Sequence, residues 1–223
     1  MRVPRAALVC AAIAFVNGAC WAVITPSLWV PDEVAHVGYV QRLAEAHKLP
    51  STGAPVDDIR VPGLAGEQVA AYEGLPFGIE GRPSWAPSAD RRLQARFDSG
   101  ELERTRPGQA VYIGNHPPLY YLLEAIPYSV AKNTGFLNRL LAMRLFSALL
   151  GAVTVFFIFL FLRELLPRTP WAWTVGALAV AFQPMVGFMT GGVNNDVLVY
   201  AASAALFFGF ARAFRRGLHR RRG

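Results

Sequence analysis

The sequence contains little cysteine and little charge. Its two cysteines, Cys10 and Cys20, both lie within the first apolar run, so they form no disulfide framework and are interpreted as small apolar residues. Only 17% of the 223 residues are charged, which excludes a chain that is disordered as a whole. Apolar residues, by contrast, make up 53%, more than the roughly half that is usual for a soluble domain. The composition therefore favours a membrane protein.

Four apolar segments are long enough to cross a membrane. Each approaches the ~20 apolar residues that the hydrocarbon core of a bilayer requires. None of them has the polar stripe that is typical of an amphipathic helix in a soluble protein. The predicted spans are roughly Ala6–Ile24, Leu140–Leu162, Trp171–Thr190 and Val197–Phe214.

The first of these segments could instead be a cleaved signal peptide, because arginines precede it and small residues lie near its end. However, it lacks the leucine of a lipoprotein cleavage box before Cys20, and its apolar run continues to Ile24. We therefore interpret it as a span.

Arginines near the ends of the four spans predict their orientation. They precede the first span, lie in the short turn between the second and the third, and follow the fourth, so all three groups fall on one side of the membrane. Because basic residues favour the cytoplasmic side, both termini are predicted to be cytoplasmic. These arginines are Arg2, Arg5, Arg163, Arg168, Arg212, Arg215, Arg216, Arg220, Arg221 and Arg222.

The basic tail after the fourth span is expected to contact anionic lipid headgroups. A nucleic-acid-binding patch is the rival interpretation, but the tail adjoins a span and has no aromatic platform on which bases could stack. Membrane lipids, and not nucleic acid, are therefore the predicted partners.

This orientation divides the chain into three parts. Residues 1–30 hold the first transmembrane helix, residues 31–138 form a large extracytoplasmic loop, and residues 139–223 hold three transmembrane helices and the basic cytoplasmic tail. Within the loop, Pro31–His47 and Tyr112–Lys132 are predicted to form helices that lie on the membrane surface, with irregular structure between them. The predicted fold is an all-α membrane protein with about four transmembrane helices.

Three polar motifs fall on the predicted outer side, and each has a simpler structural interpretation. Adjacent carboxylates suit a helix N-terminus, a histidine before two prolines suits a turn, and an Asn-Asn-Asp sequence suits the N-cap of the fourth span. Arg144 near the outer end of the second span could snorkel, and Arg139 could be interfacial. The convergence of these groups on one face of the membrane nevertheless favours a function. The motifs are Asp32-Glu33-x-x-His36, Asn115-His116-Pro117-Pro118 and Asn194-Asn195-Asp196.

The blocks PDEVAHVGYVQ, NHPPLYYLL and NND resemble those of a family of predicted bacterial integral membrane proteins. That family is similar to the GT-C class of polyprenyl-phosphate-dependent glycosyltransferases, which includes protein mannosyltransferases and aminoarabinose transferases. Enzymes of this class have an acidic motif and surface-lying helices in the first outer loop, and many have a His-Pro-Pro-like stretch before the second span. They also have more spans, so the resemblance implies a fragment, a truncated member or a chain that needs a partner membrane chain to supply further spans.

The resemblance implies that the chain transfers a sugar from a polyprenyl-phosphate donor to an acceptor on the outer face of the membrane. The acceptor needs a general base, and on this analogy Asp32 is the first candidate and Glu33 the second. Carboxylate and imidazole also share Mn²⁺ or Zn²⁺, so a divalent metal held by Asp32, Glu33 and His36 is an alternative. The spacing of these three residues matches no strong metal motif.

The lipid phosphate leaves with negative charge, which cationic or hydrogen-bonding groups must stabilise. By the same analogy His116 and Arg144 are the candidates for this role, with His36 as a further one. Asn195 and Asp196 are expected to orient the sugar or to close the cavity from the side of the third span.

The alternative function is that of a non-catalytic integral membrane subunit or a transporter fragment. A transporter places broken helices and polar groups near the midplane of the membrane. Gln183-Pro184, in the third span, is the one candidate break in the sequence. A non-catalytic subunit would tolerate Asp32→Asn, whereas an enzyme would not.

Overall fold

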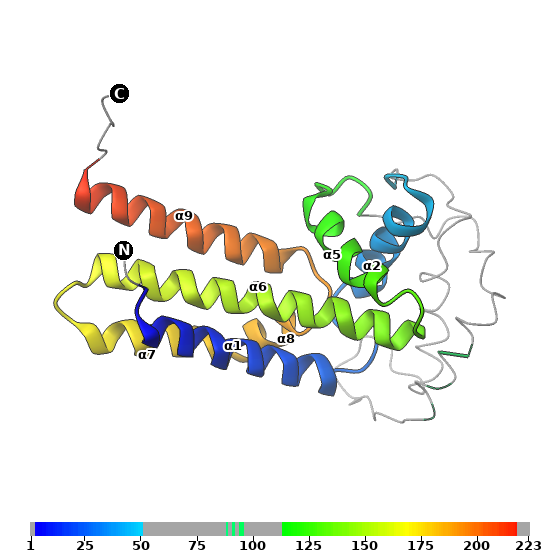
Figure 1. The fold of residues 1–223 in the computed structure, drawn as a ribbon, viewed down its shortest axis with the longest axis horizontal. Coiled ribbons are helices and arrows are strands. Elements are labelled where there is room, and N and C mark those ends of the chain that lie inside the picture. The colour runs from blue at the N-terminus through cyan, green and yellow to red at the C-terminus, as the bar shows by residue number, and fades with distance from the viewer. Residues whose placement is uncertain (1–2, 51–87, 89–90, 92–93, 96–112, 218–223) are drawn as a thin grey trace, which may run out of the picture. The chain divides into compact units, whose positions relative to one another are not determined.

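The computed structural model describes residues 3–50, 88, 91, 94–95 and 113–217, and within these ranges the chain is helical and has no strand (Figure 1). This confirms the predicted all-α class. The chain divides into two compact units. The span unit consists of Met1–Ile24 and Arg144–Gly223, and the loop unit consists of Thr25–Met143.

Three helices are long and apolar enough to cross a membrane: α1 (Arg5–Ile24), α6 (Phe136–Leu165) and α9 (Asp196–Arg216). They confirm the predicted first, second and fourth spans. The second is longer than expected, because α6 begins at Phe136 within the loop unit and continues into the span unit.

The predicted third span is broken rather than continuous. It consists of α7 (Pro170–Ala181) and α8 (Pro184–Thr190), which are bent by 61° relative to each other. Pro184 has no backbone N–H and restricts the residue before it to extended conformations, and Gln183 accordingly has a ψ of 118°. The side-chain oxygen of Gln183 then accepts hydrogen bonds from the backbone of Met185 (2.6 Å) and Val186 (3.1 Å), so it caps α8.

A hydrogen bond from α1 satisfies the carbonyl group that this break releases. In a continuous helix the N–H of Met185 would bond to the carbonyl of Ala181, but it bonds to Gln183 instead. The side-chain nitrogen of Asn17 donates to that carbonyl of Ala181 at 2.8 Å. Because hydrocarbon offers no hydrogen bonds, Asn17 makes a broken helix tolerable within the membrane.

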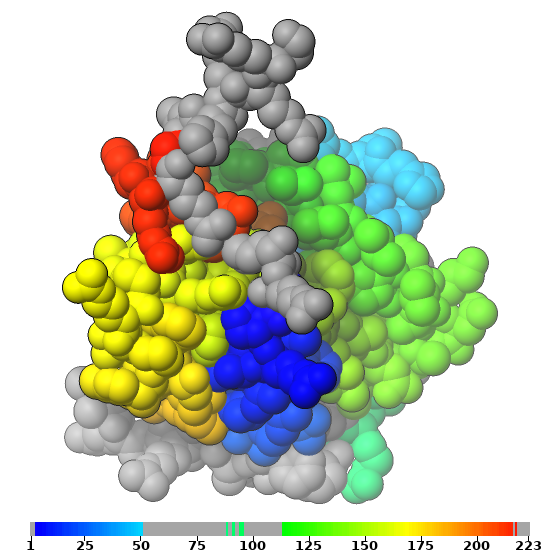
Figure 2. Space-filling model, turned by 60° about the vertical axis from the view of Figure 1, so that its left-hand side comes forward, coloured from blue at the N-terminus to red at the C-terminus, as the bar shows by residue number. Residues whose placement is uncertain are grey.

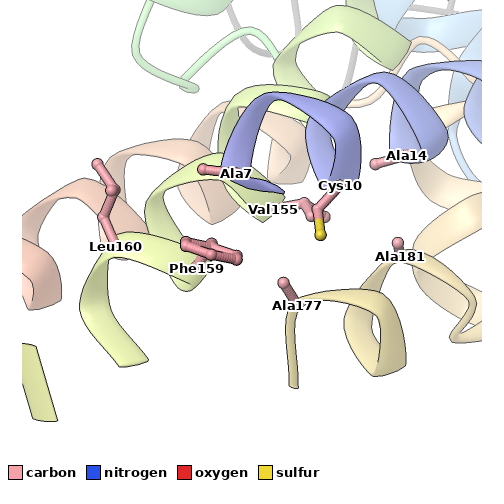
Figure 3. Packing of buried hydrophobic residues seen from close by; sticks show 8 residues of the cluster. All are labelled: Ala7, Cys10, Ala14, Val155, Phe159, Leu160, Ala177 and Ala181. Atoms are coloured by element: carbon pink, nitrogen blue, oxygen red, sulfur yellow. The ribbon is translucent and has the colours of Figure 1, made fainter. Parts of the chain in front are cut away.

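In the core of the span unit, small side chains of α1 and α7 pack with larger side chains of α6 (Figure 3). Cys10 is buried in this core as a free thiol, whereas Cys20 is exposed. Gly151 packs so tightly on α8 that a Cβ atom there would lie 2.8 Å from Thr190 Cγ2. Close approach of this kind is the usual basis of helix association in membranes. The core residues are Ala7, Cys10 and Ala14 of α1, Val155, Phe159 and Leu160 of α6, and Ala177 and Ala181 of α7.

Two helices, α2 (Glu33–Gln41) and α5 (Leu119–Val130), pack against each other in the loop unit. A π-helical turn, η1 (Arg42–Ala46), continues α2 and also contacts α5. Both helices fall within the segments predicted to be helical. The first helix of this unit begins at Glu33 and not at Pro31 as predicted, because the chain adopts a left-handed conformation at Asp32 (φ 59°), which is the N-cap of α2. The irregular segment predicted between the two helices lies largely outside the described residues.

The orientation of the spans stays a prediction that fusion proteins can test. A phosphatase that is active only outside the cytoplasm, inserted at Gly100, should be active. A fluorescent protein that folds only in the cytoplasm should fluoresce when it is fused after Gly223. The opposite pair of results would contradict the predicted orientation.

Replacing Asn17 should destabilise the span unit. In Asn17→Ala the carbonyl of Ala181 loses its partner, and we expect the free energy of unfolding to fall by about 0.5–2 kcal/mol. The measurement is thermal unfolding of the purified protein in detergent. Val16→Ala is the matched control, since Val16 lies on the same helix with 60% of its surface exposed. Equal midpoints for the two variants would contradict the assigned role of Asn17.

Candidate functional site

The hydroxyl group of Tyr121 joins two of the predicted motifs in the loop unit. It lies 3.0 Å from Nδ1 of His36, on α2, and 3.1 Å from Nδ1 of His116, in the turn before α5. Tyr121 is fully buried, His36 is 2% exposed and His116 is half-buried. The structure thus brings together two histidines that are 80 residues apart (116 − 36 = 80).

Local structure fixes the position of each member of this cluster. The ring of Tyr39, three residues after His36 on α2, stacks on the ring of Tyr121 with 3.8 Å between centroids. The Tyr39 hydroxyl also donates to the backbone carbonyl of His116 at 3.2 Å. A backbone hydrogen bond from His116 to Ile113 closes the turn. The two prolines that follow end this turn and start α5, so the His-Pro-Pro motif sets the position of the imidazole.

The arrangement restricts where the protons lie. A tyrosine hydroxyl has one proton to donate and two lone pairs that accept. At least one of the two imidazoles therefore carries a proton on Nδ1 and donates it to the Tyr121 oxygen. The cluster can hold a directed chain of hydrogen bonds from the buried histidine to the half-buried one.

Burial controls the charge of His36. The pKa of His36 is lowered from 6.5 to about 4, chiefly by burial; the carboxylate of Asp32 opposes this shift, and the nearby His116 adds to it. His36 is therefore neutral at pH 7. A neutral imidazole can both donate and accept a hydrogen bond, as the chain through Tyr121 requires.

The two predicted catalytic carboxylates have different environments. Glu33 is fully buried in the first turn of α2, whereas Asp32 is exposed at the N-cap. The Asp32 side chain makes no capping hydrogen bond with the helix. Aspartate is among the residues that tolerate a positive φ, and this conformation presents its carboxylate to solvent.

No three histidine, cysteine, aspartate or glutamate side chains in the described parts of the chain lie close enough together to bind a metal ion. The alternative of a divalent metal held by Asp32, Glu33 and His36 therefore has no support in their geometry.

Arg144 lies in the span unit and is only 3% exposed. Its guanidinium donates to the carbonyl of Ala22 at 3.0 Å. That carbonyl belongs to the last turn of α1, where helical partners are missing and a cation is favourable. Arg144 thus caps α1 and does not snorkel into solvent. A role of Arg144 in substrate binding stays a prediction.

The Asn-Asn-Asp motif also belongs to the span unit, in the turn before α9. The side-chain oxygen of Asn194 accepts a hydrogen bond from the backbone N–H of Asp196 at 2.9 Å. Asn195 is the N-cap residue of α9 without a side-chain cap, and Asp196 is exposed in the first turn. These contacts agree with the simpler interpretation, in which the Asn-Asn-Asp motif forms the turn that starts the fourth span. Substrate binding by Asn195 and Asp196 stays a prediction.

A second polar contact in the loop unit escaped the sequence analysis. The hydroxyl of Tyr128, on α5, donates to Glu45 of η1 at 2.6 Å, and Arg139 pairs with the same carboxylate oxygen at 3.2 Å. The guanidinium of Arg139 also lies 4.9 Å from the centre of the Tyr128 ring. Arg139 is thus a partner of two side chains and not merely an interfacial residue. Tyr121 and Tyr128 are seven residues apart, so they lie on the same face of α5. This spacing is the sequence signal from which a role for Tyr128 in the contact between the helices could have been predicted.

Apolar spans combined with a polar, closely packed loop unit define a helical integral membrane protein. The model of a family described as predicted membrane proteins (DUF2142) matches residues 15–223, and the chain belongs to this family. No curated protein and no solved structure matches the chain.

The loop unit should lose stability as the pH falls below the pKa of an unperturbed histidine. The pKa of His36 is about 4 in the folded chain and 6.5 ordinarily. Between these values the unfolded state binds more protons, so His36 contributes full stability above about pH 6.5 and loses it as the pH falls towards 4. The measurement is the unfolding midpoint between pH 7 and 4.5.

His36→Gln removes this titrating group and should flatten the pH dependence. The matched control is His47→Asn, because His47 is exposed in the same unit and asparagine tolerates its φ of 55°. Parallel curves for the wild type and His36→Gln would show that His36 is not the titrating group.

Proposed function

We propose that the chain is a membrane glycosyltransferase that moves a sugar from a polyprenyl-phosphate donor to an acceptor on the outer face of the membrane. The observation that carries this proposal is the contact of His36 and His116 through the hydroxyl of Tyr121. Two of the three sequence blocks that carry the resemblance meet at this hydroxyl, as expected if they serve one site.

Asp32 is the general base in this proposal. Its exposed carboxylate takes the proton of the acceptor hydroxyl while the acceptor oxygen attacks the anomeric carbon of the sugar. Glu33 is fully buried and is therefore less accessible to an acceptor. The difference in exposure supports Asp32 over Glu33.

His116 stabilises the leaving group. The bond between the anomeric carbon and the phosphate oxygen breaks, and its electron pair stays on that oxygen. His36 donates to the Tyr121 oxygen, Tyr121 donates to Nδ1 of His116, and the proton on Nε2 of His116 is then directed at the phosphate. A donor fixed in advance in this way stabilises the developing charge without further reorganisation.

Binding and transfer should respond differently to two substitutions in the full chain. The probes are a polyprenyl phosphate and its glycosylated form, added to protein purified in detergent. His116→Ala should weaken binding of the polyprenyl phosphate at least about tenfold, the effect of a lost hydrogen bond to a charged group. Asp32→Asn should keep this binding and lower transfer by about 10²–10⁴-fold, the usual contribution of a general base.

Matched variants separate these effects from misfolding. Asparagine tolerates the left-handed conformation at position 32, so Asp32→Asn should unfold at the same temperature as the wild type. His47→Asn removes an exposed histidine of the loop unit and should change neither binding nor transfer. Transfer by Asp32→Asn at the wild-type rate would rule out this mechanism. If the wild type binds polyprenyl phosphate but transfers no sugar, the chain is a polyprenyl-phosphate-binding subunit and not an enzyme.

A further inference from the structure

An apolar groove lies between the last turns of α6 and α9 in the span unit. It has a volume of about 460 Å³, within the range of roughly 300–1,000 Å³ that is typical of ligand sites. Figure 2 looks onto this end of the unit, where the end of α9 (red) lies beside the region of the α6–α7 turn (yellow). The groove is lined by Phe161, Glu164 and Leu165 of α6 and by Phe207, Phe210, Ala211, Phe214 and Arg215 of α9.

Charged side chains lie at one end of this otherwise apolar groove. The side chain of Glu164 is 1% exposed, and its carboxylate accepts a hydrogen bond from Arg215 at 2.9 Å. Arg212 lies 4.0 Å from the other oxygen of the same carboxylate. One carboxylate therefore faces two guanidinium groups, which leaves a net positive charge.

Both guanidinium groups remain accessible. The side chains of Arg212 and Arg215 are 38% and 43% exposed, although both lie near Glu164. Glu164 and Arg215 are each the next-to-last residue of a spanning helix, which is the depth of the lipid headgroups. The groove thus combines an apolar wall at acyl-chain depth with accessible cations at headgroup depth.

We propose that this groove binds an anionic phospholipid of the surrounding bilayer, with an acyl chain along the phenylalanines and the phosphate group on Arg212 and Arg215. The net positive charge selects an anionic lipid over a zwitterionic one. Arginine suits this role because its planar guanidinium binds phosphate through two parallel hydrogen bonds. Glu164 competes with the phosphate for the same arginines, so it sets how strongly the lipid binds.

Lipid preference can be measured at the groove itself. Phe210→Trp places a fluorescent reporter in the groove, and Val199→Trp places a control at the other end of α9, where Val199 is 54% exposed. Each variant of the full chain is reconstituted into vesicles of brominated phosphatidylglycerol or brominated phosphatidylcholine. Quenching of the added tryptophan, relative to the parent protein, gives the preference between the two lipids. We expect about a fivefold preference for the anionic lipid at position 210, the effect of one cationic charge near the surface, and none at position 199.

Removing the competing carboxylate tests the role of the arginines. Glu164→Gln should raise the anionic preference at position 210 by about a further fivefold, because one more positive charge is left. Removing the arginines alone would leave a buried carboxylate without its partners. The triple variant Glu164→Gln, Arg212→Gln, Arg215→Gln therefore removes all three charges together, and it should lower the preference at position 210 about fivefold relative to the protein with only Phe210→Trp.

The basic residues after Arg216 are the same in all the proteins with a tryptophan at position 210, so their attraction for anionic lipids cancels when these proteins are compared with one another. Equal preferences at positions 210 and 199, or no change in Glu164→Gln, would mean that the arginines serve only as partners of Glu164. Protection of the tryptophan at position 210 from both lipids would mean that a protein surface covers the groove. Either result would overturn the proposal.

Discussion

A backbone carbonyl without a hydrogen-bond partner is costly in hydrocarbon, and this cost governs how the span unit is built. The chain breaks its third span at a proline, which frees the carbonyl of Ala181, and Asn17 of the first helix bonds to it. The end of that first helix exposes further carbonyls, and Arg144 bonds to the one at Ala22. Asn17 and Arg144 are thus polar side chains within the spans that bond to backbone carbonyls.

The loop unit depends on a different balance. Its two helices bury tyrosines, a histidine and glutamates against one another, in place of a purely apolar core. Buried polar groups of this kind stabilise a fold only when they are hydrogen-bonded, and the contacts of Tyr121 with His36 and of Tyr128 with Glu45 join the two helical segments. A unit held in this way has little tolerance for changes in geometry. That property suits a site in which imidazole groups must be directed at a substrate.

The proposed enzyme site and the proposed lipid site use charge in opposite ways. In the loop unit, burial keeps His36 neutral, so its imidazole can orient the hydroxyl of Tyr121 through a hydrogen bond without adding a charge. At the ends of α6 and α9, two arginines face one carboxylate, and the excess charge remains accessible to an anion. The first arrangement favours orientation of a reacting group, and the second favours retention of an anionic lipid.

Properties that depend on a short stretch of sequence could be predicted without the structure. The apolar length of a segment decides whether it spans a membrane, and the Gln183-Pro184 step marked the break in the third span because proline acts on its immediate neighbours. The two helices of the loop followed from similar local signals, apart from the exact start of α2.

Only the tertiary structure decided which polar side chains meet. The motifs named the two histidines but did not show that Tyr121 joins them, since the hydrogen bond between His36 and Tyr121 joins residues 85 positions apart. Arg144 looked like a ligand for phosphate or a snorkelling side chain, and its bond to Ala22 crosses 122 positions. Contacts over such separations depend on how helices pack, and no local pattern in the sequence encodes them.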